Sequence, residues 1–305
     1  MNFIKEGLII SPSDDRIPDW GKKRLMLPTP LILKNNTLRL FLGFCDQFNI
    51  GRVGFVDLDI KNLKKIKFVS QKPSLDIGEK DDFDEHGVVP TCILKEGKVL
   101  FLYYAGFSRQ DNKYTMFEGL AVSYDEGFSF NRVNKKPILN STIKEKYFRV
   151  ASFVLKEVDS YKMWYIGGNS WREIEDKLLP EYKCQYITSS TKDVWPEDFN
   201  NCLDFNDEYE HGFSRPWVFK ENNIYCMFFG IRKNGNYYPG YAESIDGLQW
   251  VRKEDKINIS LSKTGWDSEM ITYPALFEYE SIKYYIYSGN NNGESGIGYA
   301  QIINK

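Results

Sequence analysis

Hydrophobic and polar positions alternate in blocks that repeat about every sixty residues along the chain. The repeat begins with a short apolar run, and the ends of successive runs are 61, 61, 64 and 58 residues apart. A strand rich in aromatic residues follows each run. The runs end at Leu33, Leu94, Leu155, Phe219 and Phe277, and the aromatic strands are Leu38–Phe44, Val99–Gly106, Tyr161–Gly168, Ile224–Gly230 and Ile282–Gly289. Repeats of this length, built from short strands and polar turns, are typical of propeller blades.

A third strand in each repeat is rich in small residues, and a fourth strand follows in most repeats. Only 28 residues follow Phe277, which leaves room for two strands but hardly for a fourth. We therefore expect Asn2–Ile10 to pair beside Gly296–Ile302 and to close the ring without open edges. The third strands are Gly51–Val56, Gly119–Ser123, Cys184–Thr188, Gly240–Ser244 and Gly298–Gln301, and the fourth include Phe128–Val133 and Trp250–Arg252.

The pattern predicts an all-β protein, a five-bladed β-propeller whose ring is closed by the N-terminal strand. A chain of 305 residues often forms two domains, but all-β rings commonly exceed that norm. Because the five repeats use the whole chain, we expect residues 1–305 to form a single domain.

Composition narrows the partners and the compartment. A net charge of −2 with scattered Lys and Arg predicts no nucleic-acid partner. The five cysteines are odd in number and lack CxxC spacing, which favours free thiols in a reducing compartment. The first residues do not resemble a signal peptide, and no apolar run reaches membrane-spanning length. We expect a cytoplasmic protein without a membrane partner, and the sequence leaves its oligomeric state open.

Two conspicuous motifs have a structural interpretation. Ser123–Phe130 fits the Asp-box pattern found on sialidase propellers, and Ser244–Trp250 is a variant that is one residue shorter. The side chains of Asp125 and Asp246 are expected to cap the turn between the two outer strands. Both motifs fall at the outer edge of a blade, so we do not place the functional site there.

The candidate site lies where the innermost strands begin. The positions eight residues before each run end include both histidines of the chain, each within a Glu-His-Gly tripeptide. Carboxylates lie on the same rim and arginines lie just inside it, and such groups converging on one pocket are typical of a functional site. The register positions are Leu25, His86, Tyr147, His211 and Glu269, and the charged neighbours are Asp84, Glu210, Asp267, Arg149 and Arg215.

Each candidate also has a purely structural interpretation. The histidines precede glycines and are compatible with simple turns, and the arginines are compatible with ion pairs to Asp84 or Glu210. Glu269 has the weakest structural explanation, because Trp266, Met270 and Tyr273 flank it. A carboxylate among such groups is costly to desolvate unless it is paired or used in chemistry.

Four segments resemble a glycoside-hydrolase-like family of five-bladed propellers: Phe83–Pro90, Ser214–Val218, Gly240–Trp250 and Gly265–Pro274. That family is often encoded among surface-polysaccharide biosynthesis genes, and it is similar to the N-terminal region of plant glucosamine inositolphosphorylceramide transferases. Its wider relatives resemble glycoside hydrolase families 43 and 32, which use three carboxylates from different blades. The resemblance implies a propeller that acts on carbohydrates.

This chain departs from the three-carboxylate layout in two blades. The first blade presents Arg24–Pro30, which contains no acid, and its nearest carboxylate is Asp19. In the third blade Arg149 is followed by Val150 and Ala151, where an Arg-Asp-Pro motif would place its acid. The remaining carboxylates are Asp84, Glu210 and Glu269.

We therefore predict a carbohydrate-active enzyme that cleaves a glycosidic or sugar-phosphate linkage without a cofactor. Glu269 is the expected general acid and Asp84 or Glu210 the base, since two carboxylates across a funnel can divide these roles. The expected ligand is a sugar, a sugar phosphate or a sugar nucleotide, with its anionic group held by the two arginines. The expected substrate-binding residues are His86, Arg149, His211, Arg215, Trp266, Asp267 and Tyr273.

Two alternatives remain open from the sequence. The first is a propeller that binds a sugar or a partner without turnover, which the missing acid of the first blade favours. The second is a metal-dependent sugar enzyme that uses His86, His211 and Glu269 as ligands. The two histidines belong to blades that are not adjacent, which argues against a shared ion.

Overall fold

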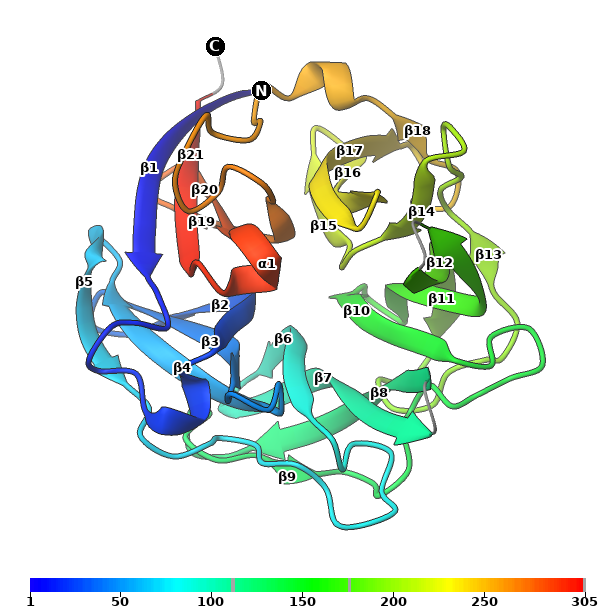
Figure 1. Cartoon of the computed structure of the whole chain (residues 1–305), viewed down its shortest axis with the longest axis horizontal. Helices are drawn as coiled ribbons and strands as arrows, with labels where there is room; N and C mark the ends of the chain where they lie inside the picture. The colour runs from blue at the N-terminus through cyan, green and yellow to red at the C-terminus, as the bar shows by residue number, and fades with distance from the viewer. Residues whose placement is uncertain (111–112, 175–176, 304–305) are drawn as a thin grey trace.

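The computed structural model describes residues 1–110, 113–174 and 177–303. Its strands form antiparallel groups arranged around a common axis, with β2, β6, β10, β15 and β19 on the inside (Figure 1). Helical structure is limited to three short turns in the described ranges. These are η1 (Asp19–Gly21), η2 (Glu254–Lys256) and α1 (Asn290–Gly293).

The strand groups follow one another along the chain, and each begins with its innermost strand. The first group contains β2 (Arg24–Leu33), β3 (Thr37–Cys45), β4 (Gly51–Asp59) and β5 (Asn62–Val69). The second contains β6 (Val88–Glu96), β7 (Val99–Gln110), β8 (Lys113–Ser123) and β9 (Asn131–Arg132). The third contains β10 (Phe148–Lys156), β11 (Tyr161–Ile174), β12 (Lys177–Ser189) and β13 (Asn200–Asn201).

The inner strand of the fourth group is interrupted. Its two parts, β14 (Glu210–Phe213) and β15 (Trp217–Glu221), both pair with β16 (Ile224–Lys233), which is followed by β17 (Asn236–Ser244) and β18 (Val251–Arg252). The last group contains β19 (Thr272–Tyr279), β20 (Ile282–Ser288), β21 (Ile297–Ile303) and β1 (Asn2–Ile10). The predicted second and third strands of every repeat are thus confirmed.

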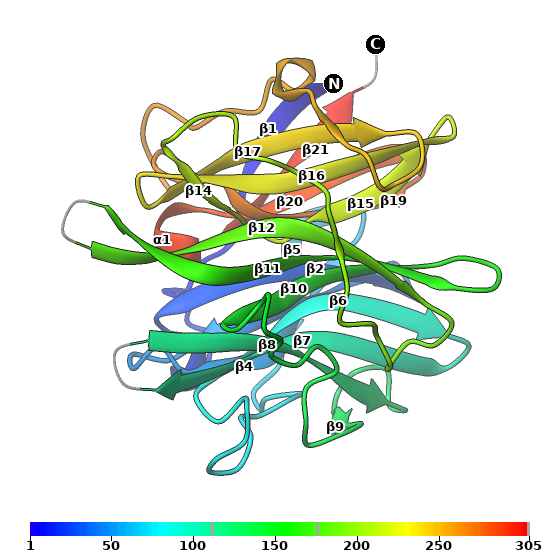
Figure 2. The same cartoon turned by 90° about the vertical axis from the view of Figure 1, so that its right-hand side faces the viewer.

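Two long hairpins join neighbouring groups. The ends of β7–β8 and β11–β12 project on the same side of the molecule as α1 (Figure 2). β8 pairs in parallel with the inner strand β10, and β12 pairs in parallel with β14. These contacts merge the second, third and fourth groups into one continuous sheet.

The first strand of the chain pairs with the last one, as the sequence predicted. β1 runs antiparallel to β21, from Phe3 opposite Ile302 to Ile10 opposite Ile297. The Phe3 ring packs edge-on against Tyr285, with ring centroids 5.3 Å apart, while Ile4 on the opposite face is exposed. The alternation of the two faces shows how β1 supplies apolar contacts to the last group.

The two Asp-box motifs cap turns, as predicted. The Asp125 carboxylate accepts hydrogen bonds from the backbone N–H and the hydroxyl of Ser129, at 3.0 and 2.6 Å. Asp246 accepts from the N–H groups of Leu248 and Gln249 at 2.8 and 2.9 Å. These hydrogen bonds satisfy the backbone donors of the turns.

Aromatic side chains pack between the groups. Trp164 of β11 is fully buried, and its indole N–H donates to the Gly247 carbonyl in the turn of the fourth group at 2.8 Å. All five cysteines are buried and free. Across residues 1–110, 113–174 and 177–303, no helix is long and apolar enough to cross a bilayer.

The pairing of β1 yields a test of stability. Phe3→Ala removes a ring packed on Phe228 and Tyr285, so the free energy of unfolding should fall by about 2 kcal/mol. Ile4→Ala on the exposed face should change it by less than about 0.5 kcal/mol. Urea unfolding of the two variants measures the difference, and equal losses would show that β1 does not pack as described.

Candidate functional site

A cavity of about 300 Å³ lies against the inner strands, and we call it the inner-strand cavity. Every strand group contributes to its lining, as do the ends of the long hairpins and the α1 turn. Representative lining residues from the groups are Leu27, Val89, Ala151, Phe213 and Tyr273.

β-bulges shape this cavity. The pairing register of β2, β10 and β19 shifts next to Leu27, Ala151 and Tyr273, respectively. These residues have positive φ angles of 51°, 58° and 53°. Side chains other than Gly rarely adopt this conformation, and such strain clusters at functional sites. The bulges re-aim residues into the cavity, which a strictly alternating strand would not do.

Asn292, which Tyr273 contacts, also has a left-handed backbone conformation. The Tyr273 hydroxyl donates to the Asn292 amide oxygen at 3.1 Å, and Asn292 also has a positive φ of 56°. Both side chains line the cavity. The sequence predicted Tyr273 as a site residue, but it held no signal for Asn292, because the turn that carries it forms only in the folded chain.

The charged lining of the cavity is entirely basic. Among the described residues, the charged side chains of the lining are Arg24, Arg109, Arg215 and Arg232, and no Asp or Glu belongs to it. Arg24 is paired with Glu294 at 2.8 Å. His86 accepts a weak hydrogen bond from the Arg109 backbone N–H at 3.4 Å. The cavity therefore favours polar or anionic ligands.

Arg215 lies at the inner side of the cavity and is fully buried. Its guanidinium donates to the carbonyls of Pro28 and Pro274 at 2.6 and 2.8 Å, and to the Thr29 hydroxyl at 3.0 Å. A longer contact of 3.4 Å reaches the Thr91 carbonyl. Burial lowers the pKa of Arg215 to about 9, so it stays charged at neutral pH. It ties β2, β6 and β19 together, and this structural task occupies both Nη groups that we expected to grip a substrate, whereas its Nε has no hydrogen-bond partner.

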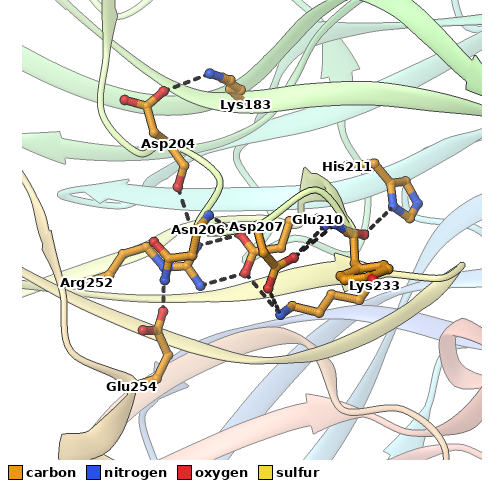
Figure 3. Close-up of polar contacts among 10 residues, drawn as sticks. Lys183, Asp204, Asn206, Asp207, Glu210, His211, Lys233, Arg252 and Glu254 are labelled. Atoms are coloured by element: carbon orange, nitrogen blue, oxygen red, sulfur yellow. Dashed lines mark hydrogen bonds and ion pairs between the residues drawn. The ribbon is translucent and has the colours of Figure 1, made fainter.

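Two predicted carboxylates are buried in ion pairs with the outermost strand of their own group. Asp84 accepts from Arg132 of β9 at 2.8 Å, and burial raises the pKa of Asp84. Glu210 accepts two hydrogen bonds from Arg252 of β18 at 2.6 and 3.1 Å (Figure 3). Lys233 lies 3.5 Å from Glu210. Neither carboxylate lines the inner-strand cavity.

Asp267 repeats this arrangement in the last group. Its carboxylate pairs with Lys5 of β1 at 2.7 Å and accepts from the Tyr287 hydroxyl at 2.9 Å. Trp266 stacks on Tyr287, with ring centroids 4.9 Å apart, and neither Trp266 nor Asp267 lines the cavity. The acids recur at nearly the same place in the repeat, because each one anchors an outer strand to its group, and this explains why the repeat pattern placed them together.

Arg149 serves a similar structural purpose. Its guanidinium pairs with Glu145 at 2.8 Å, and the same carboxylate accepts from the Tyr165 hydroxyl at 2.7 Å. Burial raises the pKa of Glu145 to about 7. The alternative prediction that Arg149 forms a structural ion pair is confirmed, although its partner is Glu145 rather than Asp84 or Glu210. Arg149 is buried away from the cavity.

The structure corrects the expected positions of Glu269 and His211. The side chain of Glu269 is exposed, whereas that of the adjacent Met270 is buried. The carboxylate of Glu269 is therefore not desolvated. His211 is buried but does not line the cavity, because the pairing register shifts between Glu210 and Gly212. Burial lowers the pKa of His211, which favours a neutral imidazole.

Metal ligation finds no support in this geometry. His86 lines the cavity, whereas His211 and Glu269 do not. In the part of the chain that the structure describes, no group of three or more His, Cys, Asp and Glu side chains is placed to hold an ion.

Like Glu145, the buried carboxylate of Glu118 escaped the sequence analysis. Glu118 of β8 is fully buried and accepts hydrogen bonds from the hydroxyls of Thr91 and Ser152, the latter at 2.8 Å. Burial raises the pKa of Glu118 to about 7. A glutamate next to the apolar stretch Gly119–Val122 was the available signal, but it lies inside a strand rather than where an inner strand begins.

Comparison with known proteins identifies the fold. No protein-family model matches the chain. The uncharacterized protein Rv1502 of Mycobacterium tuberculosis (strain ATCC 25618 / H37Rv) is 28% identical over 308 residues, which cover 100% of both chains. A solved glycoside hydrolase matches with a TM-score of 0.73 at 16% identity, over 99% of this chain and 92% of its own.

Two further structures belong to named hydrolase families. A thermostable family-43 glycoside hydrolase has a TM-score of 0.69 at 13% identity, over 92% of this chain and 90% of its own. A GH32 β-fructofuranosidase of Bombyx mori has a TM-score of 0.63 at 14% identity, over 92% of this chain and 59% of its own. The chain therefore has a glycoside-hydrolase-like propeller fold, and the resemblance inferred from the sequence is confirmed at that level.

The role of Arg215 predicts a large loss of stability on substitution. Arg215→Met removes the donors to Pro28 and Pro274 and leaves buried carbonyls unpaired, which should cost about 3 kcal/mol. Arg109→Met at the exposed rim should change stability by less than about 0.5 kcal/mol. Urea unfolding compares them, and a stable Arg215→Met protein would contradict the structural role.

The raised pKa of Glu118 predicts a pH-dependent stability. Its folded pKa of about 7 exceeds the ordinary value of 4.5, so this contribution is complete below pH 4.5 and declines as the pH rises through 7. Because of this group, raising the pH from 5 to 8 should lower the free energy of unfolding by on the order of 2–3 kcal/mol.

Glu118→Gln should remove that share of the pH dependence, because an amide does not titrate. Glu269→Gln at an exposed position is the matched control and should leave the dependence unchanged. Urea unfolding at pH 5, 6, 7 and 8 measures both. Identical pH profiles for wild type and Glu118→Gln would show that Glu118 titrates normally.

Proposed function

We propose that this glycoside-hydrolase-like chain is a single five-bladed propeller, closed by β1, whose inner-strand cavity is a central funnel that binds a sugar. The strand groups β2–β5, β6–β9, β10–β13, β14–β18 and β19–β21 with β1 correspond to the blades. The pairing of β1 with β21 supports closure. Both features match the period of the sequence.

The observation that carries the proposal is the convergence of strained bulges on one cavity. Leu27, Ala151 and Tyr273 come from different blades, and all three combine a left-handed backbone with a place in the lining. Folding stability does not require this repeated strain, whereas presenting side chains to a ligand does. The cavity also combines aromatic surfaces with a few fixed polar groups, which is typical of small-molecule sites.

The geometry favours binding over hydrolysis by the predicted acids. Glycoside hydrolysis generally requires two carboxylates that flank the scissile bond. Asp84 and Glu210 are held in ion pairs with Arg132 and Arg252, and Glu269 is exposed outside the cavity. The non-catalytic alternative, a sugar-binding propeller, therefore becomes our first proposal.

Hydrolysis of a glycosidic or sugar-phosphate linkage is the second proposal, and the similarity of the fold to glycoside hydrolases supports it. We retain the cytoplasm as the proposed location, since the five cysteines are buried free thiols. A role in surface-polysaccharide or activated-sugar metabolism remains our prediction.

Calorimetric titration with neutral sugars, sugar phosphates and sugar nucleotides tests the binding proposal. Tyr273→Phe removes the hydrogen bond to Asn292, so the affinity for a bound sugar should fall about tenfold. Tyr209→Phe, an exposed tyrosine outside the cavity, should leave it unchanged. If nothing in the panel binds the wild type, or if Tyr273→Phe binds as the wild type does, the proposal is wrong.

Product analysis on the same panel separates binding from catalysis. We expect binding without the release of sugar or phosphate. Turnover by the wild type that falls about 10²-fold or more in Glu269→Gln would instead assign the acid role to Glu269 and make the chain an enzyme.

A further inference from the structure

We propose that the sugar bound in the inner-strand cavity carries an anionic group, a phosphate or a carboxylate, and that Arg232 binds this group. The inference rests on the proposed function of the cavity and names the class of its ligand. It starts from the arginines as a set. Within residues 1–110, 113–174 and 177–303, eight of the eleven arginines form ion pairs with Asp or Glu: Arg16, Arg24, Arg39, Arg52, Arg132, Arg149, Arg172 and Arg252.

The other three arginines share one location. Among the described residues, Arg109, Arg215 and Arg232 have no carboxylate within ion-pair distance, and all three line the inner-strand cavity. Arg109 is exposed to solvent, which stabilises its charge. Arg215 directs its Nη donors to two carbonyls and a hydroxyl at the blade junction, and only its Nε lacks a partner. Arg232 is only partly exposed, and its guanidinium has a tyrosine hydroxyl rather than a carboxylate as its hydrogen-bond partner.

Arg232 retains a donor for a ligand. Its Nη1 donates to the Tyr182 hydroxyl at 3.1 Å, but its Nε is buried without any hydrogen-bond partner. A buried donor without a partner costs free energy, and native proteins rarely leave one unpaired. The guanidinium fork fits the two oxygens of a carboxylate or a phosphate, which makes such a group the matching partner.

Tyrosine hydroxyls complete the surroundings of Arg232. Tyr182 and Tyr237 share a hydrogen bond between their hydroxyls, and both side chains line the cavity. The Arg232 guanidinium lies over both rings, at 6.0 and 5.5 Å from their centroids. Neutral hydroxyls can donate to an anion, whereas carboxylates in their place would compete for the guanidinium and repel the ligand.

The size and charge of the cavity agree with a small anionic sugar. Its volume of about 300 Å³ is at the lower end for ligand sites, which favours a monosaccharide over a polymer. The described lining contributes arginines but no carboxylate, so its field attracts anions. Tyr273 and Asn292 lie in the same lining and are placed to meet the hydroxyls of the sugar.

The experiment compares matched ligands by calorimetric titration of the full chain. Glucose, galactose and N-acetylglucosamine are each titrated beside their 1-phosphates. Glucuronic acid and galacturonic acid form a second series, and inorganic phosphate is titrated alone. We expect at least one anionic sugar to bind at least tenfold more tightly than its neutral parent, with an affinity that falls as salt rises. The phosphate and uronate series distinguish the two sources of charge.

Variants then test the residue. Arg232→Met should lower the affinity for the anionic sugar by about 10- to 100-fold and leave that for the neutral parent within about twofold. Arg172→Met is the control, because Arg172 pairs with Glu181 outside the cavity and should not affect binding. Tyr237→Phe keeps the charge, loses one hydroxyl and should weaken anion binding by several fold, which provides a second readout if Arg232→Met does not fold.

The outcomes separate this inference from the proposed function. Equal affinity for neutral and anionic sugars in the wild type, or unchanged anion binding in Arg232→Met, overturns the inference and leaves sugar binding intact. Binding of inorganic phosphate that depends on Arg232, without binding of any sugar, supports the anion site and overturns the sugar function. If neither sugars nor phosphate bind, both proposals are wrong.

Discussion

The buried guanidinium of Arg215 is the contact on which the inner architecture depends. Inner strands from different groups meet there with carbonyl oxygens that no strand partner satisfies. Arg215 supplies donors to Pro28, Thr29 and Pro274 at once, from a break between β14 and β15. An apolar side chain could not serve here, because the carbonyls of several strands need hydrogen-bond donors in the same place. The inner-strand cavity lies directly against this junction, so the side chain that joins the inner strands also forms part of the cavity lining.

A second set of contacts, between buried acids and the outermost strands, is repeated around the molecule. Basic side chains on β9, β18 and β1 form ion pairs with Asp84, Glu210 and Asp267, respectively. The outer strands β9 and β18 are only two residues long and make few backbone hydrogen bonds. An ion pair to the inner end of the same group compensates for this shortage. The acids therefore recur with the repeat for a structural reason.

This repetition explains what the sequence could and could not predict. Strand positions and the pairing of β1 follow from hydrophobic periodicity and from the length left after Phe277, and these are properties of the chain itself. The site is different, because shared register cannot distinguish a structural acid from a catalytic one. Asp84 and Glu210 recur with the repeat because they are structural acids, although the sequence analysis assigned them a catalytic role. A register also assumes regular strands, and the shift after Glu210 turns His211 away from the cavity.

The residues that were missed share a physical cause. Arg232 and Asn292 lie far from the inner strand starts in sequence, on β16 and in α1, and the fold alone brings them to the cavity. The bulges that aim Leu27, Ala151 and Tyr273 contain no glycine at the left-handed position, so the usual sequence signal for this conformation is absent. Arginines were identifiable as candidates, but only the structure shows which of them lack a carboxylate.

The partnership between β1 and β21 has a consequence for biosynthesis. Phe3 lies opposite Ile302, so β1 pairs with a strand that the ribosome makes long after it. At roughly 5–20 residues per second, β1 waits on the order of 15–60 seconds for that partner. Throughout this interval its apolar positions and unpaired backbone remain available to other chains. The nascent protein is thus vulnerable to misassembly throughout the synthesis of the strands between β1 and β21.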